Sequence, residues 1–142
     1  MSLAPTVNFA SEGLIDAAVA RRLIAACGGA PGWERPAHGK NKLDLQIAKY
    51  RAASAHGAPW LILRDFDRDA SCPPELIERL QGRPTARFCL RLAVREIETW
   101  LLADRAGIAR LLRVPVGSIT RDLEMLVDPK RYLIDLASEA AP

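Results

Sequence analysis

The sequence predicts an α/β fold with a mainly parallel four-stranded sheet, flanked by helices and followed by a helical C-terminal part. Short β-prone runs alternate with segments whose apolar residues recur at helical spacing, which is typical of such folds. The run 59–63 is almost wholly apolar, as expected for a strand that is covered on both faces of a parallel sheet. We therefore expect one domain over residues 1–142, with a sheet core of about 1–94 and a helical part of about 95–142.

The expected elements follow from these patterns in chain order. They are a strand at 7–10, a helix from Leu14 to Gly28-Gly29, a loop at 30–39 with a short strand around Trp33, a helix at 40–56, a strand at 59–63, a helix at 73–80, a strand at 87–94, helices at 95–103 and 105–113, and a last helix from 129. Ser11 is expected to cap the first helix. Asp104 is expected to cap the helix that starts at 105, and Asp128 the last one, where Pro129 takes the first helical position.

The composition excludes some classes of protein and leaves others open. No apolar stretch reaches the roughly 20 residues that a membrane helix needs, and the start of the chain lacks the pattern of a secretory signal. We therefore expect a cytoplasmic protein without a membrane partner. The three cysteines are widely spaced and form no disulfide framework. The formal charge of +3 and the pI of about 9.0 are compatible with a polyanionic partner but do not require one.

Carboxylates follow two of the expected strands. Glu12 follows the first strand, and Asp65 and Asp67 end the central one, where ligands of open α/β sheets bind. On an extended chain residues i and i+2 project to the same side, so we expect the two aspartates to point together. Their repulsion would be relieved by a bound cation, and Mg²⁺ (or Mn²⁺) suits such oxygen ligands. Asp69 and Glu96 extend the predicted ligand set.

Simpler interpretations of the same acids stay open. Aspartates after strands often only stabilise turns, and Glu12 or Glu96 can complement the dipole of the helix that follows. Several basic residues are candidates for phosphate binding. They are Lys40, Arg64, Arg68, Arg95 and Lys130. The arginines can instead pair with the acidic cluster and neutralise it, because a guanidinium forms two hydrogen bonds to one carboxylate.

Two motifs resemble a known family. Glu12-Gly13 after the first strand and Asp65-Phe66-Asp67 after a later one resemble the Toprim domain of topoisomerases, primases and nucleases. The segments 95–104 (REIETWLLAD) and 128–130 (DPK) resemble small bacterial Toprim-like proteins, and the resemblance runs from about Phe9 to Ala137. It implies a Rossmann-like Toprim fold, with Glu12 as general acid/base or metal ligand and with Asp65 and Asp67 as Mg²⁺ ligands.

These expectations lead to two hypotheses about function. The first is a Mg²⁺-dependent nuclease or phosphoryl-transfer enzyme acting on nucleic acid or a nucleotide, with Glu12, Asp65 and Asp67 as its catalytic residues. The second is a non-catalytic module that binds nucleic acid or protein through a degenerate Toprim site. The second is motivated by residues 13–16 (GLID), which lack the polar pair common after the Toprim glutamate, and by the end of the chain at Pro142, where a further basic segment is expected.

Overall fold

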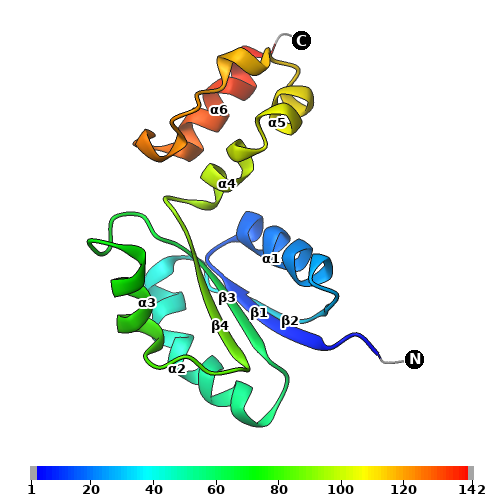
Figure 1. Ribbon diagram of the computed structural model, residues 1–142, viewed down its shortest axis with the longest axis vertical. Coiled ribbons are helices and arrows are strands. Elements are labelled where there is room, and N and C mark those ends of the chain that lie inside the picture. Colours follow the sequence, from blue (N-terminus) through cyan, green and yellow to red (C-terminus); the bar gives the residue numbers. More distant parts are fainter. Residues whose placement is uncertain (1–2, 141–142) are drawn as a thin grey trace. The chain divides into compact units, whose positions relative to one another are not determined.

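The computed structural model describes residues 3–140 and has the predicted α/β fold (Figure 1). The chain divides into two compact units, Met1–Leu92 and Ala93–Pro142, which we call the sheet unit and the helical unit. The division lies close to the boundary expected near residue 94, while the single domain over the whole chain stays a prediction. Among the described residues, no helix is both long enough and apolar enough to cross a membrane.

The sheet unit is built from alternating strands and helices. They are β1 (Thr6–Ser11), α1 (Leu14–Ala26), β2 (Ala30–Pro36), α2 (Lys40–His56), β3 (Trp60–Asp65), α3 (Pro73–Gln81) and β4 (Phe88–Ala93). The strands form one parallel sheet in the order β2-β1-β3-β4, a Rossmann-like arrangement. The chain therefore leaves β1 towards β2 and later crosses back over β1 to reach β3. This reversal is a topological switch point between the carboxyl ends of β1 and β3.

Helices cover both faces of the sheet. Figure 1 shows α1 on one face and α2 and α3 on the other, as right-handed crossovers in opposite directions require. The largest side chains in the core are almost fully buried. They are Phe9, Ile62, Leu63 and Leu90 from the strands, Leu43 and Ile47 from α2, and Leu76 from α3. Each stabilises the fold by about 1.5–3 kcal/mol through the apolar area that it removes from water.

Two expectations for this unit are wrong. Residues 30–36 form a full strand rather than mostly a loop. Pro31 and Pro36 are tolerated because β2 is an edge strand, where a missing N–H need not break a ladder. Ser11 does not cap α1. It ends β1, its hydroxyl donates to the carbonyl of Gly13 at 3.1 Å, and Gly13 holds the N-cap position without a side-chain bond.

The helical unit packs around its own small core. Its elements are α4 (Ile97–Ala103), α5 (Arg105–Leu112), the short 3-10 helices η1 (Val116–Ser118) and η2 (Leu123–Met125), and α6 (Pro129–Glu139). The core consists of Leu102, Ala109, Ile119 and Leu136. Both predicted caps are confirmed, because Asp104 accepts from the N–H of Gly107 at 3.0 Å and Asp128 from that of Arg131 at 2.8 Å.

Candidate functional site

Glu12 lies directly after β1, beside the end of β3. Its Oε1 accepts a hydrogen bond from the backbone N–H of Asp65 at 3.1 Å, which ties the ends of the two strands together. The loop after β2 packs against the same place, since the N–H of Gly39 donates to the carbonyl of Glu12 at 3.2 Å. Gly39 has a φ of 118°, which favours glycine. This turn starts α2 and brings Lys40 to the switch point.

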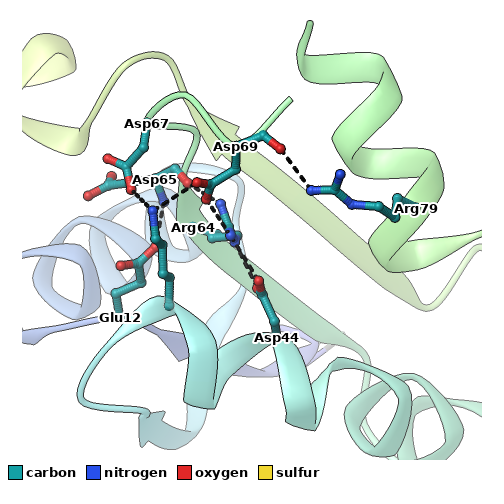
Figure 2. A network of polar contacts seen from close by, with 8 residues as sticks. Glu12, Asp44, Arg64, Asp65, Asp67, Asp69 and Arg79 are labelled. Atoms are coloured by element: carbon teal, nitrogen blue, oxygen red, sulfur yellow. Dashed lines mark hydrogen bonds and ion pairs between the residues drawn. The ribbon is translucent and has the colours of Figure 1, made fainter. Parts of the chain in front are cut away.

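Lys40 joins two aspartates of the loop that follows β3. Its Nζ lies 2.6 Å from Oδ2 of Asp67 and 2.9 Å from Oδ1 of Asp69 (Figure 2). About a third of the Lys40 side chain stays exposed, at 33%. The hydrogen bond that Lys40 donates to Asp67 is the main cause of a raised pKa of Lys40, so this lysine is a stable cation. The predicted phosphate ligand Lys40 thus lies among the predicted metal ligands.

Arg64 forms the buried part of the same network. Its side chain is 2% exposed; its Nε and Nη2 donate to Asp44 at 2.7 and 2.8 Å, and Nη2 also donates to Asp69 at 2.7 Å. Burial works against the charge, but the two carboxylates outweigh it and raise the pKa of Arg64. Its Nη1 donates to the carbonyl of Asp65 at 2.6 Å. Of the two roles foreseen for Arg64, these contacts match pairing with the acidic cluster.

The loop after β3 does not have the expected geometry. Asp67 has a φ of 50°, in the left-handed region that few residues other than glycine adopt. The strand ends at Asp65, and Phe66 turns into the core at 9% exposure. The expectation that Asp65 and Asp67 point together assumed an extended chain, and this premise is wrong. Asp67 and Asp69 share Lys40 instead, and Figure 2 shows both carboxylates within the network.

Glu12 has the most perturbed carboxyl group of the cluster. Burial raises its pKa from 4.5 to about 7, and the nearby charges of Asp67 and Asp16 add to this. The hydrogen bond from Asp65 and the charge of Arg64 act in the opposite direction. Glu12 is therefore protonated in part of the molecules near neutral pH. A carboxyl group in this state can take up or give up a proton during a reaction.

The remaining predicted site residues lie elsewhere. Arg68 follows Asp67 and is exposed. Arg95, Glu96 and Lys130 belong to the helical unit, where Arg95 donates to the carbonyl of Glu124 at 3.3 Å and Lys130 is exposed in the first turn of α6. Glu96 takes the N-cap position of α4. The part of these three residues in the carboxylate cluster stays a prediction.

Whether Mg²⁺ suits this cluster depends on the donors and on their arrangement. Glu12, Asp65, Asp67 and Asp69 supply the hard oxygen ligands that Mg²⁺ prefers. Among the described residues, however, no group of three or more His, Cys, Asp or Glu side chains is arranged to hold a metal ion. Lys40 already lies between Asp67 and Asp69 as their cation. The donor chemistry fits Mg²⁺, but the ion would have to take the place of the Lys40 ammonium.

Two members of the cluster are absent from the sequence-based prediction. Asp44 binds Arg64 from α2, and Asp16, which is 7% exposed in the first turn of α1, acts on the charge of Glu12. A signal existed for both residues. Asp44 follows Lys40 by four residues on α2, one helical turn, and Asp16 lies in the first turn of the helix that follows Glu12.

Comparisons with known proteins leave the family open. No family model, no curated protein and no solved structure matches this chain. The resemblance to the Toprim domain thus rests on the short motifs around Glu12 and Asp65, and it stays a prediction. The function has to be argued from the site itself.

Proposed function

We propose that this chain is a cytoplasmic, Mg²⁺-dependent phosphoryl-transfer protein that cleaves nucleic acid or a nucleotide at the carboxyl ends of β1 and β3. The observation that carries the proposal is the meeting of Glu12, Asp67 and Lys40 at the topological switch point. Open parallel sheets bind their ligands at this point, and here the side chains supply both carboxylates and an accessible cation. Glu12 and Asp67 also belong to the motifs that resemble the Toprim domain.

The residues of the cluster would have different roles in binding and in proton transfer. Lys40 is partly exposed and carries a positive charge that a phosphate oxygen can approach. Glu12 can exchange a proton with an attacking water, because its pKa of about 7 leaves both protonation states populated. Arg64 holds Asp69 in place from the buried side. Asp65 fixes Glu12 through its backbone N–H.

Asp65, Asp67 and Asp69 are the residues that would hold Mg²⁺ or Mn²⁺, with Glu12 beside them. When bound, the ion would supply Lewis acidity towards the phosphate. Lys40 would have to leave Asp67 and Asp69 for these carboxylates to hold the ion, and its ammonium would then be available to the substrate. Metal binding and phosphate binding are therefore expected to support each other.

A second function is favoured by one observation. Lys40 neutralises Asp67 and Asp69 without a metal, so the cluster is complete as an ion-pair network. Such a network suits a non-catalytic module that binds nucleic acid or a protein through its exposed surface. In that case the acids only shape the loop after β3.

The test combines metal binding with cleavage. Titration calorimetry with Mg²⁺ and Mn²⁺ is expected to show a site in the native protein that is lost in the double variant Asp67→Asn/Asp69→Asn. Labelled single-stranded and duplex DNA and RNA, incubated with metal, should be cut by the native protein. Glu12→Gln and Asp67→Asn should each lower the rate at least about a hundredfold, as expected for a lost proton-transfer group or metal ligand.

A matched control is available on α3. Glu75 is an exposed carboxylate that binds Ser71 and neither Lys40 nor Arg64, so Glu75→Gln should leave metal binding and cleavage unchanged. Circular dichroism would verify that every variant is folded. If the native protein binds no metal and cuts none of these substrates, the enzymatic proposal fails and the binding module remains. Unchanged cleavage in both Glu12→Gln and Asp67→Asn would show that the activity lies elsewhere.

A further inference from the structure

A second feature lies at the opposite end of the sheet, away from the carboxylates. A slot of about 500 Å³ opens near the amino ends of the strands. Among the residues that line it are Thr6 and Asn8 of β1, Gly32 and Trp33 of β2, Gly57 after α2 and Trp60 of β3. Its volume lies in the range of small-molecule sites, roughly 300–1,000 Å³. The presence of two tryptophans gives the slot an aromatic lining.

Trp33 lies at an irregularity in the pairing of β1 and β2. Across β1 and β2, Val7 pairs with Pro31 and Phe9 with Glu34, so two residues of β2 face one residue of β1. This is a β-bulge, a device that redirects side chains and is frequent beside functional sites. Trp33 lies at this bulge and is 67% exposed, on the same outward-facing side of β2 as Pro31 and Arg35.

Asn8 and Gly32 fix this bulge. The Oδ1 of Asn8 accepts the backbone N–H of Trp33 at 2.9 Å and so replaces the ladder bond that the bulge removes. A Cβ on Gly32 would come within 2.5 Å of the same Oδ1, so only glycine leaves room for the bond. The exposed tryptophan is thus positioned by specific contacts of its backbone.

Two arginines contact residues that line the slot. The guanidinium of Arg35 lies 5.5 Å from the centre of the Trp33 ring, a cation–π contact. Arg87, which is exposed, donates to the carbonyl of Gly57, a lining residue, and to that of Ser54 at 3.0 Å. The ring of Trp60, which is 6% exposed, stacks on that of Tyr50 at 4.3 Å. An anionic ligand with a flat aromatic group would match both the charges and the rings.

We propose that this slot binds a base of single-stranded nucleic acid, stacked on Trp33, with Arg35 and Arg87 next to the flanking phosphates. Exposed aromatic rings combined with arginines are the usual means of holding single strands, because every base offers a flat face. A base-paired duplex keeps its bases stacked inside and cannot present one to the slot. The inference deepens the proposed function, on which it rests for the class of substrate.

Helix α2 connects the slot with the carboxylate cluster. Lys40 begins α2 at the cluster, and Gly57, which lines the slot, follows its last residue. A helix of 17 residues spans about 25 Å, so a strand held at both places would be several nucleotides long. Lys42 and Lys49 are exposed on α2 and, seven residues apart, lie on one side of the helix. They supply positive charge along this path.

The experiment measures binding without cleavage. A fluorescein-labelled oligothymidylate is titrated with protein in low salt and EDTA, and its anisotropy is compared with that of a duplex of equal length. We expect the native protein to prefer the single strand. Trp33→Ala should weaken this binding about tenfold, the magnitude of one lost base stack, while Trp33→Phe retains most of it. Unlabelled thymidine monophosphate should compete only weakly, because it lacks the chain along α2.

The matched control is Leu45→Ala, which removes another exposed apolar side chain, at 80% exposure, from α2. It should bind like the native protein. Equal affinity of the Trp33→Ala and native proteins, or no binding of the single strand by the native protein, would overturn the inference. Because metal is absent, the result is separate from catalysis. Trp33-dependent binding without any cleavage in Mg²⁺ would contradict the proposed enzymatic function and support the proposed role of the slot.

Discussion

The ion-pair network at the switch point has two sides that differ in their exposure. On the inner side Arg64 is 2% exposed and is bound by Asp44, Asp69 and a backbone carbonyl. On the outer side Lys40 is 33% exposed and holds Asp67 and Asp69. Asp69 belongs to both sides and links them. The same pairing of charges therefore occurs in two very different surroundings.

The two sides of the network are therefore expected to have different roles: the inner side stabilises the fold, and the outer side can open to a ligand. A buried charge that loses its partner has no water to replace it, so the inner side must stay intact for the loop after β3 to keep its shape. A half-exposed pair gains little from its attraction, because water and salt screen it. The outer side can therefore open at low cost. A ligand that competes for Asp67 or for Lys40 would act there.

Substitution of Arg64, on the inner side of the network, is expected to cause the largest loss of stability. Arg64→Met leaves Asp44 and Asp69 without their buried partner and should lower the free energy of unfolding by about 3 kcal/mol. Arg64→Lys should lose less, because it keeps the charge but not the two-pronged hydrogen bonds to Asp44. Urea unfolding followed by circular dichroism measures both variants.

Arg68 provides the control for this prediction. It lies in the same loop but is exposed, so Arg68→Met should change the free energy of unfolding by less than about 0.5 kcal/mol. A similar loss in the Arg64 and Arg68 variants would mean that burial does not separate the two sides of the network.

Glu12 should give an intermediate effect that depends on pH. The folded protein holds the Glu12 proton up to about pH 7, whereas an unfolded chain releases it near 4.5. The folded state thus binds more protons in this window, and its stability falls as the pH rises from about 4.5 to about 7. Allowing for solvent screening of a half-buried group, the fall should amount to about 1–2 kcal/mol.

Glu12→Gln isolates this contribution. The amide keeps an oxygen for the N–H of Asp65 but has no proton to release, so the difference between the native protein and the variant should follow the titration of Glu12. Arg64, Asp65, Asp67 and Asp16 are the groups that act on it. Denaturation at about pH 5 and about pH 8 measures the difference. If the two proteins keep the same relative stability at both pH values, Glu12 titrates normally and the burial argument is wrong.

The sequence allowed most of the fold to be predicted, but the contacts of the site only in part. The apolar run of β3 and the helical spacing of α2 are local patterns, and both elements were found. Residues 30–36 were expected to be mostly a loop because prolines disfavour strands, and only the strand order shows that β2 is an edge. Lys40 is 27 residues from Asp67, and no local pattern predicts a contact over that separation.

Conformation also limited the prediction of the site. The strand ends at Asp65, so the rule that alternate residues of a strand share a face does not extend to Asp67, whose φ is positive. The sequence nevertheless singled out Glu12, Asp67, Asp69 and Lys40 as candidates, and each follows a strand or starts a helix at the carboxyl ends of the strands. It did not predict that the lysine would occupy the position expected for the metal.

Substitution of Lys40 should cause the smallest change in stability. It also tests directly whether the outer side of the network can bind a metal ion. Lys40→Met removes a half-exposed ion pair, so the free energy of unfolding should change by less than about 1 kcal/mol. Asp67 and Asp69 would then lack their cation, and Mg²⁺ should bind roughly fivefold more tightly than to the native protein, since a competing charge is gone. Titration calorimetry measures this, with Lys42→Met as the control for a neighbouring exposed lysine. Weaker or unchanged Mg²⁺ binding in Lys40→Met would show that the lysine does not stand in for a metal, and the network would then be a fixed part of the fold on both sides.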